Sequence, residues 1–186
     1  GFVKKEVWIL PENGKRLLEI EKALRSKVQL TTGVTFMSDT NLSWSTISLY
    51  EALTQVAPFT TGSATIEIID GVEPSIHLVM QDFGDLPVFL SVSGEQIIVE
   101  ALLWPLSDVA DIALFNDAIL RTHKYFPLST ISLDSVGGRD YYYMFGALSA
   151  ASILPNVVLE IETLANNVIH ATEAYQQFLL QESVAS

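Results

Sequence analysis

Between residues 64 and 148 apolar and polar residues alternate over short stretches, which is the pattern of half-buried β-strands. Two-residue glycine turns, Gly94–Glu95 and Gly137–Gly138, separate two pairs of these stretches. Links this short make neighbouring strands antiparallel, because a parallel pair needs a long crossover. The pattern predicts strands at residues 64–70, 75–81, 86–93, 96–104, 130–136 and 141–148.

Three segments around these strands repeat apolar residues at helical spacing. The first is 45–56, where Ser48 followed by Glu51 indicates a capping box. The second starts at a cap, Ser107 or Asp108, and runs to about residue 125. The third is the longest and runs from a cap at Asn156 to about residue 180. Its apolar stripe has heptad spacing and consists of Ile161, Leu164, Val168, Ala171, Tyr175 and Phe178.

Together these elements predict an α+β body over residues 43–182. We expect an antiparallel sheet of about five to six strands with helices packed on one face, in the order α-β-β-β-α-β-β-α. The other sheet face and the heptad side of the last helix are then candidate association surfaces. Residues 1–42 differ in character and predict a basic N-terminal arm or small lobe, with a helix over 15–28 and a polar linker over 38–43.

Charge also divides the chain, at about residue 30. Of the ten Lys and Arg residues, seven lie in the first thirty residues against four Glu, which gives a net charge of +3 there. The other 156 residues hold three cations and eighteen carboxylates, a net charge of −15. A body this acidic repels nucleic acid and anionic lipid. It attracts a basic partner or the chain's own basic arm, or it simply keeps the protein soluble.

Candidate chemistry is sparse. The chain has no cysteine, and its three histidines show no ligand-like spacing, so we expect no metal and no cofactor. Carboxylates are abundant, but none forms a recognisable acid–base pair. Arg121, His123 and Lys124 make one basic spot in the acidic body, which is either an anion site or a cap on the negative end of a helix.

Aromatic residues give the clearest candidate contact surface. In a strand, Tyr141, Tyr143 and Phe145 share one face. That face is either core or an aromatic recognition surface, since tyrosine is favoured at interfaces. Tyr175 and Phe178, on the stripe of the last helix, are the other candidate partner-binding residues.

Two stretches, residues 94–105 (GEQIIVEALLWP) and 120–133 (LRTHKYFPLSTISL), resemble the YjfI type of uncharacterised bacterial proteins. The resemblance covers roughly residues 45–182 and brings no catalytic residues with it. It implies a partner in a membrane-stress system, a helical protein like phage-shock protein A, because genes of the family commonly lie beside one for such a protein. The order of elements is also similar to that of type III secretion chaperones, which implies dimerisation and binding of other proteins.

These observations favour a non-enzymatic, protein-binding or chaperone-like adaptor that forms a homodimer and binds no nucleic acid. We expect it in the cytoplasm, because no apolar run approaches the roughly 18 residues of a membrane helix and no secretory signal opens the chain. Two alternatives remain open. One is an enzyme using Asp or Glu acid–base chemistry, and the other is an amphipathic arm, residues 15–28, that binds anionic lipid.

Overall fold

The computed structural model describes residues 43–180. The predictions for residues 1–42 fall outside this range. The described residues contain a six-stranded antiparallel sheet in the order β1-β2-β3-β4-β6-β5, which confirms the predicted fold class. The strands are β1 (Ala64–Ile69), β2 (Ser75–Met80), β3 (Leu86–Ser93), β4 (Gln96–Pro105), β5 (Thr130–Val136) and β6 (Arg139–Ser149).

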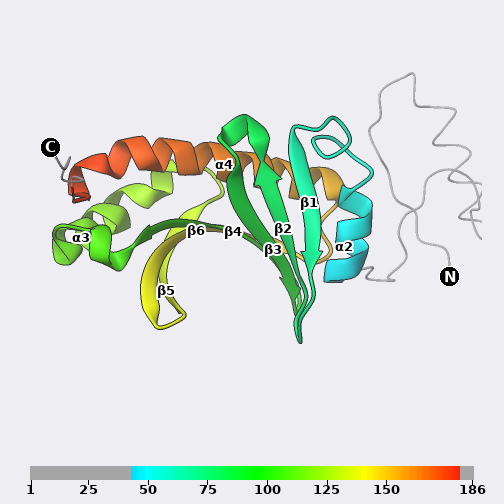
Figure 1. The fold of residues 1–186 in the computed structure, drawn as a ribbon, viewed down its shortest axis with the longest axis horizontal. Helices are drawn as coiled ribbons and strands as arrows, with labels where there is room; N and C mark the ends of the chain where they lie inside the picture. The colour runs from blue at the N-terminus through cyan, green and yellow to red at the C-terminus, as the bar shows by residue number, and fades with distance from the viewer. Residues whose placement is uncertain (1–42, 181–186) are drawn as a thin grey trace, which may run out of the picture. The chain divides into compact units, whose positions relative to one another are not determined.

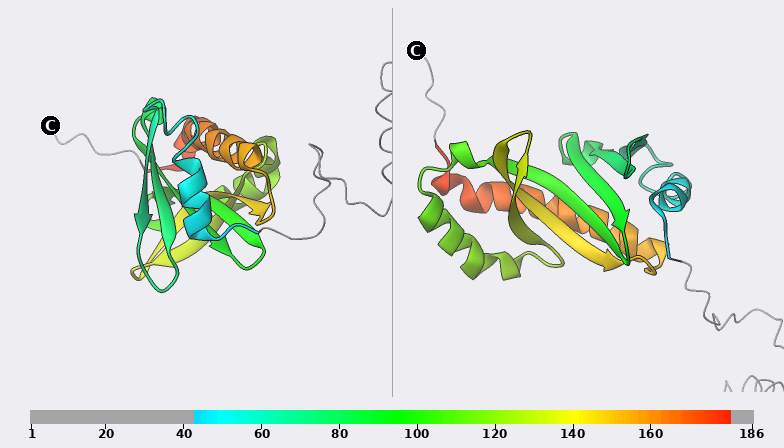
Figure 2. Two further views of the ribbon diagram at one scale, coloured as in Figure 1. Left: turned by 90° about the vertical axis from the view of Figure 1, so that its right-hand side faces the viewer. Right: turned by 90° about the horizontal axis from the view of Figure 1, so that it is seen from below.

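Three α-helices accompany the sheet: α2 (Thr46–Leu53), α3 (Ile112–Thr122) and α4 (Leu154–Tyr175). The predicted order of strands and helices is confirmed, with four strands preceding α3. The sheet is strongly curved, and α4 runs along one side of it while α2 lies beside β1 (Figure 1). Seen from below, the strands lie in front and α4 behind them (Figure 2). The helices therefore cover one face, as the sequence predicts.

Alternate residues of the strands point toward α4 and form the core. Ile76, Leu78, Val88, Leu90, Ile97, Val99 and Met144 are all buried on this face. The heptad stripe of α4 meets them, since Ile161, Leu164, Val168, Ala171 and Tyr175 are buried as well. The expectation that this stripe is an association surface is therefore wrong, because the chain's own sheet occupies it.

Helix ends differ from the prediction in three places. Ser45 and Ser48, rather than Ser48 and Glu51, form the capping box of α2. The cap of α3 is Asp111, whose carboxylate accepts from the Leu114 amide, because residues 106–108 form a separate 3-10 turn. Helix α4 starts two residues before Asn156, where Pro155 occupies the first turn and needs no amide partner.

A bulge in β4 moves one large side chain across the sheet. Leu102 pairs with Tyr143, but the next pair is Pro105 with Tyr141, so β4 contains one extra residue there. Strict alternation would place Trp104 opposite the helices. The bulge turns it to the helix side instead, where it contacts Phe115 and Tyr175 edge to face at 5.9 and 6.3 Å between ring centroids.

Candidate functional site

The sheet face that points away from α4, which we call the open face, is the candidate interface. Among residues 43–180 no helix lies over its centre (Figures 1 and 2). It would normally carry polar side chains if it only faced water. Instead it mixes apolar, aromatic and charged residues, namely Glu67, His77, Phe89, Ile98, Glu100, Leu102, Asp134, Tyr141, Tyr143 and Phe145.

One row of directly opposed residues crosses all six strands of the open face. Its members, in sheet order, are Glu67, His77, Phe89, Glu100, Phe145 and Thr130. His77 Nδ1 lies 2.7 Å from the Glu67 carboxylate, and its ring stacks on Phe89 with centroids 5.0 Å apart. The row is therefore organised in the free protein and not a set of independent side chains.

Glu100 is the unusual member of this row. Its direct neighbours on the two adjacent strands are Phe89 and Phe145, and its side chain is half-buried between them. Desolvation raises the pKa of Glu100, and the negative charge of Asp134 raises it further. An acidic group in these surroundings gains more from an incoming cation than a fully hydrated carboxylate does, because part of its hydration is already lost.

Of the predicted tyrosines, Tyr143 lies nearest to Glu100, and Tyr141 lies two residues further along the same face of β6. Register places Tyr143 opposite Leu102 and Ser132, and Tyr141 opposite Asp134. Desolvation raises the pKa of the Tyr143 hydroxyl, with further contributions from Glu100, Asp134 and Tyr141. Tyr141, Tyr143 and Phe145 are all half-buried on the open face, so the structure brings these three predicted residues together.

The other two predicted contact residues lie elsewhere. Tyr175 is only 3% exposed. Its ring lies 5.4 Å from that of Phe115, and Phe178 contacts the same ring at the same centroid distance. Both residues belong to the aromatic cluster under α3 and α4, on the side of the sheet away from the open face.

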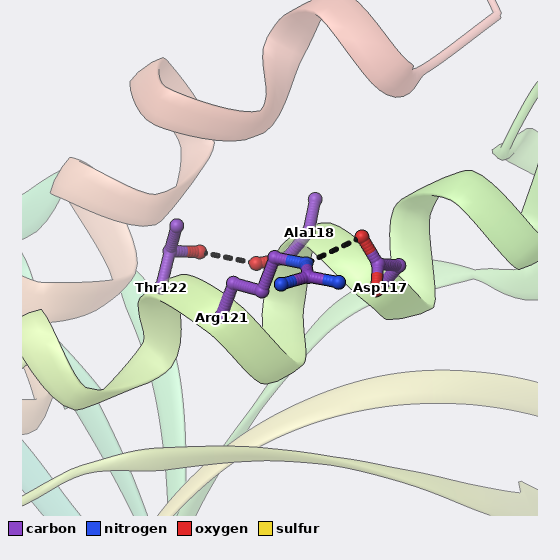
Figure 3. A network of polar contacts seen from close by, with 4 residues as sticks. All are labelled: Asp117, Ala118, Arg121 and Thr122. Atoms are coloured by element: carbon purple, nitrogen blue, oxygen red, sulfur yellow. Dashed lines mark hydrogen bonds and ion pairs between the residues drawn. The ribbon is translucent and has the colours of Figure 1, made fainter.

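The predicted basic spot gives its three side chains separate contacts. Arg121 Nε donates to Asp117 at 2.7 Å along α3, as Figure 3 shows. His123 Nδ1 lies 2.6 Å from Thr130 Oγ1, and the Lys124 ammonium stands 5.2 Å from the ring of Tyr125. These contacts do not converge on one point, and a shared anion site has no geometry to support it here.

Sequence reasoning missed His77, Phe89 and Glu100 as members of the site. Strand alternation by itself shows only that each of them lies on the face of its strand opposite the buried residues. What makes them notable is their alignment across three neighbouring strands, which depends on register. The sequence signal for the site was Glu100, a carboxylate within the apolar run of β4. Because Val99 and Ala101 point into the core, the side chain between them must point to the opposite face.

The described residues offer apolar and charged contact area and no arrangement of metal ligands. No group of three or more His, Asp or Glu residues in the described part of the chain is placed to hold a metal ion. None of the helices in residues 43–180 combines the length and the apolar character needed to cross a bilayer. What the open face offers is apolar contact area around a partly desolvated carboxylate.

Comparison with solved structures shows the fold. The crystal structure of YbjN, a candidate transcription regulator from E. coli, matches with a TM-score of 0.54 and 10% sequence identity. The match covers 75% of this chain and 97% of YbjN. At this identity the two proteins share a fold, and the likeness says nothing of a shared role.

Comparison of sequences is more specific. The uncharacterized proteins YjfI of Escherichia coli strain K12 and of E. coli O157:H7 are each 31% identical to this chain over 137 residues. The aligned part is 74% of this chain and 98% of either relative. A family model described as "Uncharacterized protein conserved in bacteria (DUF2170)" matches residues 43–179, and this chain belongs to that family.

Proposed function

We propose that this protein is an adaptor that holds a partner protein on its open face. The observation that carries the proposal is Glu100, a carboxylate placed between Phe89 and Phe145 on a sheet face that no helix of residues 43–180 covers. A solvated sheet face has no need of half-buried phenylalanine and tyrosine. Aromatic residues around a polar centre are typical of the energetic core of protein interfaces.

The chemistry of the open face specifies the partner segment. It should present apolar side chains for the aromatic residues and a Lys or Arg for the Glu100–Asp134 pair. The rest of the surface favours the same partner, since residues 43–180 contain only three Lys or Arg, namely Arg121, Lys124 and Arg139. An acidic surface of this kind steers a basic segment toward the face and repels acidic competitors.

Site-specific photocrosslinking tests this proposal in the full chain. A photoreactive p-benzoylphenylalanine replaces Tyr143 on the open face, and the matched control replaces Leu159, which is exposed on α4. Crosslinking is carried out in cells that express the protein, and the attached peptide is identified by mass spectrometry. Each probe is repeated with Glu100→Lys and with Glu162→Lys, a charge reversal at an exposed position of α4.

We expect a protein captured at position 143 and not at 159, through a peptide that contains Lys or Arg among apolar residues. Glu100→Lys should reduce the yield at least about fivefold, while Glu162→Lys should not, because only the first reverses a charge at the interface. Equal capture at both positions, or capture at 143 that survives Glu100→Lys, contradicts the proposal. Capture of a second copy of this chain instead makes the open face a dimer interface and contradicts the choice of a foreign partner.

The resemblance to the YjfI type supports a more specific form of the proposal, in which the partner is a helical protein like phage-shock protein A. A helix with apolar residues on one face and Lys or Arg beside them fits the chemistry of the open face. The homodimer, the chaperone-like role and the cytoplasmic location belong to the same proposal. Sedimentation of the full chain over a range of concentrations tests the homodimer without reference to the partner.

An enzyme using Asp or Glu chemistry is the alternative. It requires carboxylates that converge in a concave site. The cavity described in the next subsection is lined by no Asp or Glu, and Glu100 and Asp134 lie on an open sheet face. The geometry of the described residues therefore favours the adaptor.

A further inference from the structure

A cavity of about 440 Å³ lies between the end of α3 and the last turns of α4, away from the open face. This volume is within the range of small-molecule sites in proteins, roughly 300–1,000 Å³. Four aromatic residues form its walls: Tyr125, Phe126, Tyr175 and Phe178. Ala118 on α3 and Ala174 on α4 leave the space between them, because both are small.

The walls of the cavity are fixed by the core. Tyr175 and Phe178 each contact Phe115, which is fully buried, at 5.4 Å between ring centroids. Phe126 contacts Tyr175 at 6.0 Å. Aromatic side chains held in this way do not collapse into the space beside them, so the cavity exists before any ligand arrives.

The polar groups on the inner wall of the cavity, those of Asn167 and Tyr175, can only accept further hydrogen bonds. Asn167 is 3% exposed, and its amide nitrogen already donates to the Pro127 carbonyl at 2.7 Å and to Ser129 Oγ at 2.9 Å. Both amide hydrogens are therefore used. Within residues 43–180 no hydrogen bond to Asn167 Oδ1 is formed, so this oxygen, which is not fully buried, stays available as an acceptor at the cavity.

The second group, the Tyr175 hydroxyl, is left with acceptor capacity only, because of its contact with the half-buried Thr122. Thr122 donates its only hydroxyl hydrogen to the Ala118 carbonyl at 2.6 Å (Figure 3). In the 2.7 Å contact between Thr122 Oγ1 and the Tyr175 hydroxyl, the tyrosine must therefore be the donor. The Tyr175 oxygen keeps its lone pairs and has no hydrogen left to give. The remaining polar residues of the lining, Tyr125, His170 and Gln177, are exposed and stand at the rim.

We infer that this cavity binds a small, flat, largely apolar molecule that carries an N–H or O–H donor. The aromatic walls provide contact area for a ring, and Asn167 Oδ1 and the Tyr175 oxygen provide acceptors for its donor. An anion does not fit, since it would meet acceptors and no buried cation. A ring without a donor would cover these acceptors without pairing them, and its binding is weaker for that reason.

Indole and benzofuran are the matched probes, because they have the same shape and differ only at one ring atom, an N–H donor in indole and an oxygen in benzofuran. Each is titrated into the ¹⁵N-labelled full chain, and amide shifts are followed by NMR. The blocking variant is Ala174→Leu, which fills the cavity from an exposed helical position. The control is Ala113→Leu, the same change on an exposed face of α3 outside the lining.

Saturable shifts around Thr122, Asn167 and Ala174 are expected with indole. Benzofuran should bind about tenfold more weakly, because it cannot satisfy the acceptor. Ala174→Leu should weaken indole binding at least tenfold, and Ala113→Leu should leave it unchanged. If Ala174→Leu disturbs the folded spectrum, Ala118→Leu fills the same space from the other helix.

Three results overturn the inference: no saturable shift with indole up to its solubility limit, equal affinity for the two probes, or equal loss of binding in the blocking and control variants. The outcome does not depend on the proposed function. The cavity and the open face lie on opposite sides of the sheet, and the crosslinking experiment does not alter the cavity.

Discussion

A buried carboxyl group on α4 makes the sharpest stability prediction for this protein. Glu160 is 2% exposed, and its Oε1 is the one buried side-chain polar atom of the described residues without a hydrogen-bond partner. The carboxyl lies against Gly146 of β6. A β-carbon built on Gly146 would stand 1.6 Å from Glu160 Oε1 and 3.2 Å from the Leu128 carbonyl oxygen. Glycine at position 146 is therefore required by the carboxyl group and not by a turn.

Gly146→Ala should destabilise the protein by about 1–3 kcal/mol, the usual cost of overpacking a core. The carboxyl cannot keep its place beside a methyl group 1.6 Å away, and it has no solvent to move into. The same substitution should become close to neutral in a Glu160→Ala background. With the carboxyl gone, the remaining tight contact is the Leu128 carbonyl oxygen at 3.2 Å, and its cost is offset because alanine loses less backbone entropy in a strand than glycine does.

Urea denaturation followed by circular dichroism measures all four members of this double-mutant cycle at neutral pH. The matched control is Gly71→Ala, where the new β-carbon would meet its nearest neighbour, the Glu73 carbonyl oxygen, at an ordinary 3.5 Å. We expect that variant to change the free energy of unfolding by less than about 0.5 kcal/mol. If Gly146→Ala costs the same with and without Glu160, the contact between the two residues is not what excludes a side chain at position 146, and the reasoning fails.

Three further variants test other parts of the description. Burial raises the pKa of Glu160, so the folded state holds a proton that the unfolded chain releases, and stability should fall as the pH rises above the ordinary glutamate value. Glu160→Gln should reduce the pH dependence of the free energy of unfolding by up to about 1.4 kcal/mol per pH unit, measured by urea denaturation from acidic to neutral pH. An unchanged pH dependence would mean that other groups cause it. Asn167→Ala should cost about 2–4 kcal/mol in urea denaturation, because Pro127 and Ser129 lose their common donor, whereas a loss below about 1 kcal/mol would mean that water replaces it. Ser45→Ala removes the cap of α2 and should cost about 1 kcal/mol, seen as a lower Tm, unless the helix contributes nothing to folding.

The strands could be predicted closely because their signal is local. Alternation and glycine turns located β3 and β5 to the residue and the other strands to within two residues. Helix ends were less accurate, because several residues near each end can serve as caps and tertiary contacts choose among them. Asp111 caps α3 instead of Asp108 because residues 106–108 first close a turn of their own.

Contacts between distant elements could not be predicted from a single sequence. The heptad pattern of α4 correctly predicts an amphipathic helix, yet the pattern is the same whether the partner is another chain or the protein's own sheet. The bulge that moves Trp104 to the helix side has no composition signal. Glu160 and Gly146 look like an ordinary helix carboxylate and an ordinary strand glycine, and only their contact makes either residue informative.

The buried polar residues of α4 also explain how the open face keeps its geometry. The Asn167 amide donates hydrogen bonds to both Pro127 and Ser129. Leu128 between them adopts a left-handed conformation with φ of 63°, which is costly for a leucine. This segment leads directly into β5, the edge strand that carries Asp134. Asp134 adds to the effect of desolvation in raising the pKa of Glu100, so through β5 the contacts of α4 contribute to the electrostatics of the open face. If the open face binds a partner as proposed, loss of Asn167 should weaken that binding even under conditions in which the variant is fully folded.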